Sequence, residues 1–212
     1  MLFDEAEGMK GAGRRCVNKG RAALYAMVRR CHELDIHNVH IKCHLFNSLV
    51  KPILFYGSEI WGPALLAKGA CLTDTSLSGD SEVIHKGFLR QCMSLRKSVV
   101  EYVLMSELHR EPLFLSLFQL FLRFWNRIYL RPDSDLVKMA MQESCDVAKA
   151  GISFCWAGFL SSILKNLGID LFCDPIKSSL DVEVILSSAR DQWLSKISRD
   201  LATYSSVGMR CS

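Results

Sequence analysis

The stretch PLFLSLFQLFLRFWNRIYL, residues 112–130, decides the fold of this chain. Pro112 is suited to the first turn of a helix, where its missing N–H leaves no hydrogen bond unmade. The residues after it are apolar at nearly every position around a helical circumference, which is typical of a helix at the buried centre of a domain. The sequence therefore predicts a central apolar helix at about residues 112–130, with other helices packed around it.

A long helix is also predicted at about residues 10–33, because its apolar residues repeat with the helical period. Gly11, Gly13 and Gly20 weaken this helix, each costing about 1 kcal/mol relative to alanine in a helix interior. Its predicted inward stripe is Cys16, Leu24, Met27, Cys31 and Leu34.

The next helical pattern covers residues 39–61. Pro52 removes one backbone donor and predicts a kink or break near it. Gly62-Pro63 predicts the end of the element, and the Ser-, Thr-, Asp- and Gly-rich residues 73–80 predict a surface loop. Ile41, Leu45, Leu49, Ile53 and Ile60 repeat at close to helical spacing, with Phe46, Val50 and Leu54 adjacent.

A helix capped by Asp80 or Ser81 follows, and a shorter one opens at the capping box of Ser98 and runs to about Leu108. The first of these is predicted to turn Ile84, Phe88, Cys92 and Leu95 inward. Its outer face is predicted to show His85, Lys86, Arg90, Arg96 and Lys97.

Helices are predicted at about residues 134–149, 154–167 and 181–204 in the C-terminal part. Gly151 and Gly168 stand where C-terminal stops belong, and Asp181 is a plausible cap for the last helix. No stretch alternates cleanly with a period of two, so no strand is predicted. The predicted fold class is all-α, a bundle-like array of helices.

The charge changes sign along the chain. Residues 1–131 hold 18 Lys+Arg and 12 Asp+Glu, whereas residues 132–212 hold 8 and 10. We therefore expect a basic helical region over 1–131 and a neutral-to-acidic helical extension over 132–212, with Arg131-Pro132 as the boundary.

Composition excludes several classes of protein. Half of the 212 residues are hydrophobic, which argues against intrinsic disorder, and no uncharged apolar run reaches the length of a bilayer-spanning helix. The acidic N-terminus lacks the apolar segment of an export signal, so we expect an intracellular protein with reduced thiols at its 9 cysteines. The mean hydropathy of +0.15 predicts apolar surface that either a partner or a missing part of the chain covers.

Basic residues form the best functional feature of the sequence, because they occupy the outer arc of the predicted helix at residues 10–33. A cationic helix face is suited to a phosphate backbone. A solvated outer face, an acidic protein partner and a membrane surface are the alternatives. The basic residues between Gly8 and His32 are Lys10, Arg14, Arg15, Lys19, Arg21, Arg29 and Arg30.

Metal and catalytic motifs are weak or missing in the sequence. The cluster Cys31, His32, His37, His40, Cys43 and His44 matches no compact zinc spacing, so we expect core thiols and surface imidazoles rather than a metal. We find no paired-aspartate centre, phosphate loop or nucleophile elbow, and Asp133 and Asp135 are better interpreted as a helix cap. We therefore expect no enzymatic activity, no cofactor and no small-molecule substrate.

The run KPILFYGSEIWGP, residues 51–63, is the most distinctive in the chain. Taken alone, Tyr56 and Trp61 can either stack on bases or anchor a core, and the core is favoured. The run resembles the region after the catalytic domain in reverse transcriptases of LINE-type (non-LTR) retrotransposons. The segments GRAALYAMVRRCHELDI, VIHKGFLRQCMSLRKS and EYVLMSELHREPL resemble the same family in collinear order, so the likeness covers about residues 8–130.

The resemblance implies the thumb and the start of the C-terminal extension of such an enzyme, without its palm, its Asp-Asp polymerase centre or its endonuclease. In that family the region grips the template–primer duplex, so RNA or an RNA–DNA hybrid, and the remainder of a reverse transcriptase, are the implied partners. A nuclear location is implied by the family alone. The family signature matches Pro52, Tyr56, Gly57, Glu59 and Trp61, to which we assign structural roles.

The predicted function is therefore that of a non-catalytic fragment that binds nucleic acid through backbone charge. The predicted contact residues are the seven cations of residues 10–30, with Lys86 and Arg90. Two alternatives stay open. One is a helical protein-interaction or scaffold domain, and the other is a decayed relic without independent function.

Overall fold

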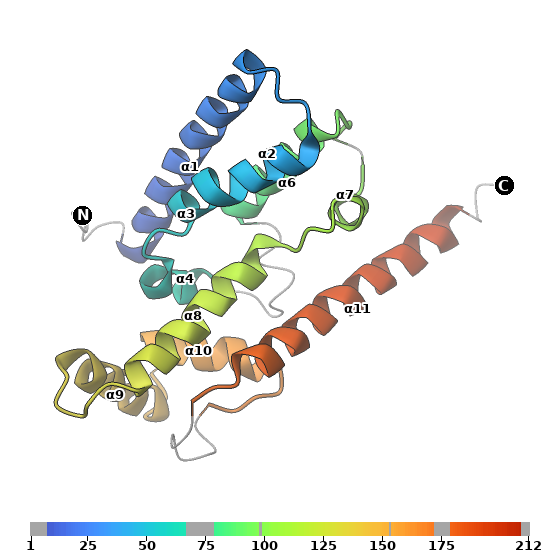
Figure 1. Cartoon of the computed structure of the whole chain (residues 1–212). Coiled ribbons are helices and arrows are strands. Elements are labelled where there is room, and N and C mark those ends of the chain that lie inside the picture. The colour runs from blue at the N-terminus through green and yellow to red at the C-terminus, as the bar shows by residue number, and fades with distance from the viewer. Residues whose placement is uncertain (1–7, 67–78, 98, 153, 172–178, 209–212) are drawn as a thin grey trace.

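The computed structural model describes residues 8–66, 79–97, 99–152, 154–171 and 179–208. Every regular element within these ranges is a helix, which confirms the all-α prediction (Figure 1). The loop predicted at residues 73–80 lies almost wholly outside the described residues. Among the helices described, none combines the length and the hydropathy that crossing a bilayer requires.

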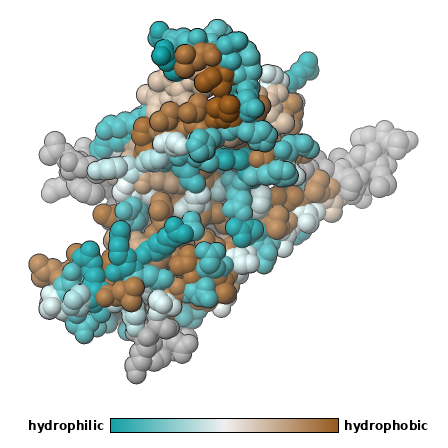
Figure 2. All heavy atoms as spheres, viewed as in Figure 1, coloured by the Kyte–Doolittle hydropathy of each residue, from teal (hydrophilic) through white to brown (hydrophobic). Residues whose placement is uncertain are grey.

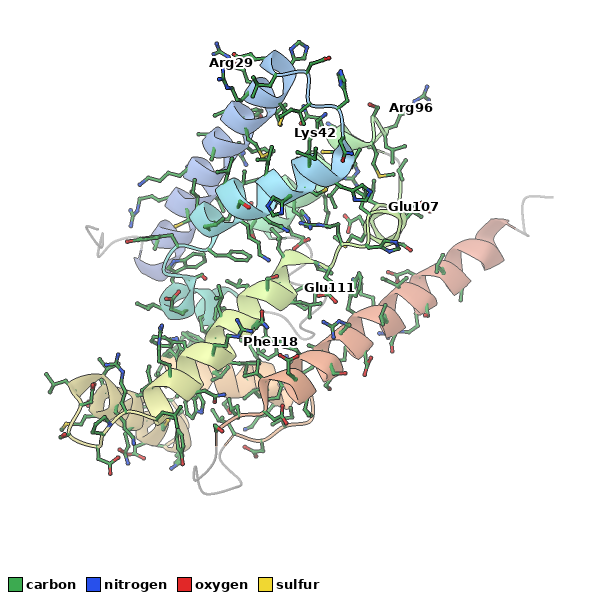
Figure 3. The ribbon with its side chains drawn as sticks, viewed as in Figure 1. Arg29, Lys42, Arg96, Glu107, Glu111 and Phe118 are labelled. Atoms are coloured by element: carbon green, nitrogen blue, oxygen red, sulfur yellow. The ribbon has the colours of Figure 1, made fainter. Side chains whose placement is uncertain are left out.

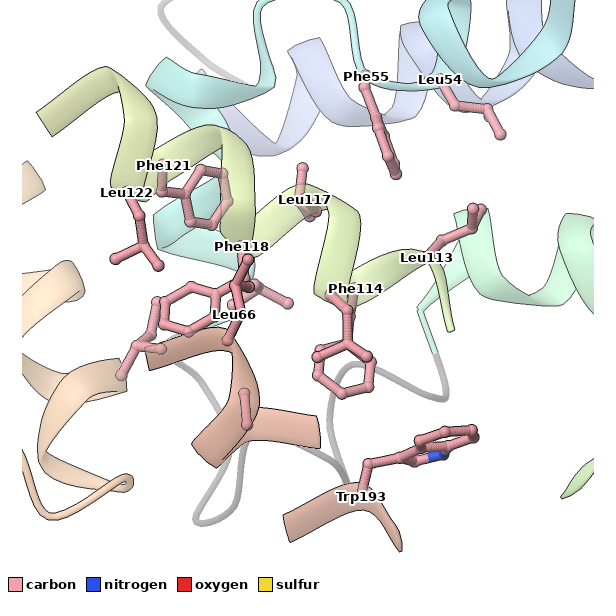
Figure 4. Close-up of a cluster of buried hydrophobic side chains, with 14 of the residues drawn as sticks. Leu54, Phe55, Leu66, Leu113, Phe114, Leu117, Phe118, Phe121, Leu122 and Trp193 are labelled. Atoms are coloured by element: carbon pink, nitrogen blue, oxygen red, sulfur yellow. The ribbon is translucent and has the colours of Figure 1, made fainter. Parts of the chain in front are cut away.

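The central helix, α8, spans Leu113–Tyr129 and confirms the prediction from the opening stretch. Phe118, Phe121 and Leu122 have no exposed surface. The helices α4 (Ser58–Leu66), α6 (Asp80–Cys92) and α11 (Val182–Gly208) pack against it from different sides. Figure 4 shows the side chains of α8 among those of Leu66 and Trp193 from two of these helices.

A buried carboxylate fixes the start of α8. Glu82 of α6 is 1% exposed, and its Oε2 accepts a hydrogen bond from the backbone N–H of Leu113 at 2.8 Å. Its Oε1 lies 3.2 Å from Nδ1 of His85, whose ring stacks on Phe46. An acid at a helix N-terminus accepts a hydrogen bond from an otherwise unpaired N–H group, and its negative charge interacts favourably with the helix dipole. Glu82 therefore sets the register between α6 and α8.

The first helix, α1, spans Gly8–Glu33 and buries Cys16, Leu24, Met27 and Cys31, as predicted. Leu34 lies beyond the helix end and is 55% exposed, so the prediction that places it on the inward stripe is wrong. Gly20, expected to weaken the helix, instead permits a close approach. A Cβ atom there would lie 2.3 Å from Cδ2 of Leu54.

The segment after α1 divides into α2 (Val39–Leu45), the π-helix η1 (Phe46–Val50), α3 (Lys51–Leu54) and α4. The N–H of Lys51 bonds to the carbonyl of Phe46, five residues earlier, in a wide turn that precedes Pro52. Such a turn makes room for a proline ring that clashes with a regular helix. The kink or break predicted near Pro52 is confirmed, because α3 ends at Leu54 and α4 begins after Gly57, where φ is +65°. The end predicted at Gly62-Pro63 is wrong, because α4 continues to Leu66.

Of the two apolar sets in this segment, the one containing Phe46 is the buried one, and from the other set Leu45 packs partly against the core. Phe46, Val50 and Leu54 are buried, whereas Ile41 and Leu49 are 49% and 51% exposed. Both stripes repeat at helical spacing, and the packing of α1 against η1 and α3 decides which one is covered. Ile60, which continues the repeat of Ile41 and Leu49, is 46% exposed. Figure 2 shows hydrophobic surface interspersed with hydrophilic surface on the face it views.

Gly62 and Pro63 lie inside α4, and each permits a contact between α4 and another helix. A Cβ atom on Gly62 would lie 2.4 Å from Cζ of Phe121, so only glycine lets α4 approach α8 this closely. Pro63 has no N–H to give to the carbonyl of Glu59, four residues earlier. That carbonyl accepts a hydrogen bond at 2.8 Å from Nε1 of Trp156, at the start of α10 (Trp156–Lys165).

The helices α6 and α7 match their predictions in part. Ile84 and Phe88 are buried as expected, but α6 ends at Cys92, so Leu95 lies beyond it and is 37% exposed. The helix α7 spans Glu101–Glu107, with Val100 at its N-cap position. Ser98, the predicted cap, lies outside the described residues.

The C-terminal helices α9 (Leu136–Lys149), α10 and α11 fall close to the predicted ranges. Asp135 caps α9 through Val137 N–H at 2.8 Å, and Asp181 accepts from Val184 N–H at 3.2 Å. Gly151 and Gly168 adopt positive φ values of +91° and +75° after α9 and α10, as their predicted role as stops requires.

The basic and acidic parts of the chain share one core. α10 packs on α4, and α11 packs on α8. The side-chain amide of Asn126 in α8 makes two hydrogen bonds of 2.8 Å to the backbone of Leu180, just before α11. One hydrophobic cluster contains buried residues from both sides of Arg131. The hydrophobic core therefore continues across Arg131-Pro132, where the charge of the chain changes.

Replacing Gly62 with alanine is expected to lower the free energy of unfolding by about 1–3 kcal/mol, because the new methyl group overlaps the buried ring of Phe121. Gly87 of α6 is the matched control, since a Cβ there meets nothing within 4 Å. Gly87→Ala is expected to raise the free energy of unfolding by about 0.5–1 kcal/mol. Urea denaturation followed by circular dichroism measures both changes, and equal effects would contradict the close packing of α4 on α8.

Replacing Trp156 with phenylalanine is expected to cost about 1–2 kcal/mol of stability, because the carbonyl of Glu59 loses its indole donor. The cost is expected to shrink in a Pro63→Ala background, where residue 63 regains an N–H for that carbonyl. A double-mutant cycle in urea tests this coupling. Strictly additive effects would show that Trp156 acts through packing alone.

Candidate nucleic-acid interface

The cationic face of α1 is held outward by the burial of the opposite stripe. Ala12, Cys16 and Met27 are each no more than 5% exposed and pack toward the rest of the fold. The helix contacts η1, α3, α4 and α6 through this side. Helical periodicity then directs the intervening basic residues to solvent.

The predicted contact residues of α1 lie on its outer arc. The helix rises about 1.5 Å per residue, so Arg14 and Arg30 are separated by about 24 Å along its axis. Arg14, Lys19, Arg21, Arg29 and Arg30 are exposed, and Arg15 is half-buried. The side chain of Lys10 lies outside the described residues. We call these cations, from Arg14 to Arg30, the α1 cationic face.

A single acid interrupts this surface within the helix. Glu33, at the C-terminal end of α1, binds Arg30 Nη1 at 3.0 Å and Arg29 Nε at 2.9 Å. Hydrogen bonds from Arg30 and then Arg29 lower the pKa of Glu33. These pairs are exposed, so they contribute little stability and a stronger anion can displace Glu33. Figure 3 shows Arg29 at this end of α1.

An exposed aromatic ring lies within the α1 cationic face. Tyr25 is 69% exposed and stands one helical turn from both Arg21 and Arg29. An accessible ring among cations is suited to stacking on an unpaired base. The helical period contains this signal, because Tyr25 falls opposite the buried stripe, but the prediction from sequence does not include it.

The predicted outer face of α6 is wrong for its first half. His85 has no exposed surface, and Lys86 is 6% exposed with its Nζ 2.6 Å from Oε2 of Glu101. Arg90 is half-buried, and its Nη2 donates to the carbonyl of Val99 at 3.4 Å. The helix contacts α1, α7 and α8, so it is enclosed on more than one side. Lys86 and Arg90 therefore do not join the α1 cationic face.

Arg96 and Lys97, by contrast, are exposed, beyond the end of α6. Figure 3 labels Arg96. They follow Cys92 in the connection to α7.

The residues on which the resemblance to reverse transcriptases rests make local and long-range contacts, through backbone carbonyls and the Trp61 indole. The carbonyl of Tyr56 accepts hydrogen bonds from Nε1 of Trp61 at 3.1 Å and from Sγ of Cys16 at 3.6 Å. Glu59 offers its carbonyl to Trp156, and Trp61 is 5% exposed. The ring of Tyr56 is 66% exposed, so it is not a core anchor. Pro52, in the first turn of α3, is also exposed.

The cysteine–histidine cluster is dispersed in space. Cys31 and Cys43 are buried, whereas His40 and His44 point to solvent. Burial raises the pKa of the Cys43 thiol. Within the described part of the chain, no three His, Cys, Asp or Glu side chains come together as a metal site.

Replacing Lys86 with alanine is expected to lower the free energy of unfolding by about 1–3 kcal/mol, because the buried stem and the pair with Glu101 are lost. Arg21→Ala is the matched control and is expected to change stability by less than about 0.5 kcal/mol, since its side chain is exposed. Urea denaturation compares the two. A neutral Lys86 variant would contradict its burial.

Comparisons of the chain with protein families, with curated proteins and with solved structures found no match.

Proposed function

We propose that the chain binds nucleic acid through the α1 cationic face, as a non-catalytic fragment of a retrotransposon reverse transcriptase that grips template–primer backbone. The observation that supports this most directly is the outward arc of cations from Arg14 to Arg30, with Glu33 as the one acid of the helix. Phosphates condense counterions, and binding cations release them, which drives association.

The geometry favours recognition of the backbone over recognition of sequence. Arginine and lysine side chains on one convex helix face meet phosphates and carry no pattern that reads base edges. Tyr25 adds one surface for stacking, which tolerates any base. RNA or an RNA–DNA hybrid is the proposed ligand. This preference, the remainder of a reverse transcriptase as a partner, and a nuclear location all rest on the sequence resemblance.

A second candidate function is that of a helical interaction domain. It is favoured by apolar side chains exposed around α9, where Leu130 is 77%, Leu136 is 80% and Phe154 is 88% exposed. Apolar residues that gather on a surface mark sites for protein partners. This function predicts stable association in light scattering and no salt-sensitive affinity for nucleic acid. A decayed relic without independent function predicts neither.

The proposal is tested by fluorescence anisotropy with a labelled RNA–DNA hybrid across a salt series. We expect affinity to fall steeply with salt, because each phosphate contact contributes about 0.7–0.9 to the slope of log affinity against log salt. Replacing Arg14, Arg15, Arg29 and Arg30 with alanine is expected to weaken binding to all sequences alike and to reduce that slope by about 3.

The matched control is a quadruple variant with the same change in net charge. It replaces with alanine four exposed cations outside α1, namely Arg96, Lys97, Lys149 and Lys165. It is expected to weaken binding much less. Equal losses of affinity in the two quadruple variants would show that net charge alone controls binding. The α1 cationic face would then not be the site. No binding by the folded wild-type chain would remove the nucleic-acid function.

A further inference from the structure

Two further cations, outside α1, lie close enough in space for the charge of one to act on the other. Lys51, at the start of α3, and Arg110, between α7 and α8, are both half-buried. Nζ of Lys51 donates to Oγ of Ser116 at 2.8 Å, and Nη2 of Arg110 donates to Oδ1 of Asn47 at 2.5 Å. Asn47 and Lys51 are one helical turn apart. These four residues form what we call the Lys51–Arg110 cluster.

The positive charge of this cluster is not neutralised by its neighbours. Among the residues that the structure describes, no carboxylate lies within ion-pair distance of Lys51 or Arg110. Glu111 follows Arg110 directly, but its Oε1 is bound to Nε of Arg190 in α11 at 2.5 Å. Glu183 and Asp191 also act on Arg190. Glu111 is the acid that acts on Lys51, and it is held by Arg190, so Lys51 and Arg110 keep an excess of positive charge.

The local environment makes this excess unfavourable without an anion. The pKa of Lys51 is lowered, mainly by burial and then by the charge of Arg110, while Glu111 opposes the shift. Two like charges in a half-desolvated site raise each other's energy, and an opposite charge between them relieves both effects. Such unsatisfied charge is typical of a ligand site.

Positive charge continues from the cluster along α8. Arg123 and Arg127 follow Ser116 by seven and eleven residues, which places them on the same face of the helix. Both are exposed, and no acidic residue occurs in α8. Figure 3 shows Glu111 at the N-terminal end of this helix, with Phe118 further along it.

We propose that the Lys51–Arg110 cluster binds a phosphate group. Lys51 and Arg110 supply charge-assisted hydrogen bonds, for which the several oxygens of a phosphate are matched acceptors. Ser116 Oγ keeps its own proton to donate, and the amide nitrogen of Asn47 is a further donor beside Arg110. The phosphate belongs either to a nucleic-acid backbone that follows α8 or to a free phosphorylated molecule. The site is separate from the α1 cationic face and does not depend on its function.

The test titrates the full chain with inorganic pyrophosphate by isothermal titration calorimetry and, separately, with a labelled single-stranded oligonucleotide by anisotropy. Lys51→Met and Arg110→Met are each expected to weaken pyrophosphate binding by about tenfold or more, the effect of losing one charge-assisted hydrogen bond. Lys149→Met, an exposed cation on α9, is the matched control and is expected to leave binding unchanged. Glu111→Gln is expected to strengthen binding, because it removes the nearby negative charge.

Circular dichroism and urea denaturation establish that each variant is folded, and Lys51→Met is expected to be at least as stable as the wild type because it removes a half-buried charge. Loss of both ligands identifies a backbone phosphate, and loss of pyrophosphate alone identifies a free phosphate. A wild-type chain that binds no pyrophosphate, or folded variants that bind it normally, would overturn the proposal. The pyrophosphate results are independent of how the α1 quadruple variant behaves.

Discussion

The burial of α8 is the constraint on which the other helices depend. Its side chains are apolar almost all the way round, and fully burying one Leu or Phe side chain is worth about 1.5–3 kcal/mol. Helices on several sides are needed to remove such a surface from water, and α4, α6, α9 and α11 supply them. The last two belong to the acidic part of the chain, so the change of charge at Arg131 does not divide the core.

A few buried polar contacts give this apolar packing a defined register. Glu82 meets the first N–H of α8, Trp156 meets the carbonyl that Pro63 leaves without a backbone donor, and Asn126 holds the chain before α11. Each one satisfies a backbone group that would be costly to bury alone. Gly62 acts by its missing side chain, because it lets α4 reach Phe121. These contacts select one arrangement among the many that hydrophobic burial alone permits.

The same packing separates the cations into two kinds. Those of α1, from Arg14 to Arg30, are mostly exposed, opposite the buried stripe of the helix. There they are suited to long-range attraction of a nucleic acid and to contacts that let its phosphate backbone slide. Lys51 and Arg110 are half-buried at a junction of four segments, where each has a fixed side-chain partner and lacks a neutralising carboxylate. The cations of α1 favour binding along a phosphate backbone at no fixed position. Lys51 and Arg110 favour binding of a single phosphate group at one position. The two proposals therefore concern different physical contacts.

By itself, the sequence determined the all-α class, the central helix at residues 112–130, the α1 cationic face and the stops at Gly151 and Gly168, because each rests on local periodicity or local backbone preference. Only the tertiary structure decided which of two apolar stripes is buried after residue 39. The stripes of Phe46 and Leu49 both repeat at helical spacing, and the packing of α1 covers the first of them. The tertiary structure also decided that His85 and Lys86 are enclosed and that Gly62-Pro63 continues a helix. It placed Lys51 within the electrostatic influence of Arg110, 59 positions away in the chain. Those outcomes depend on contacts between residues distant in sequence, which no local pattern encodes.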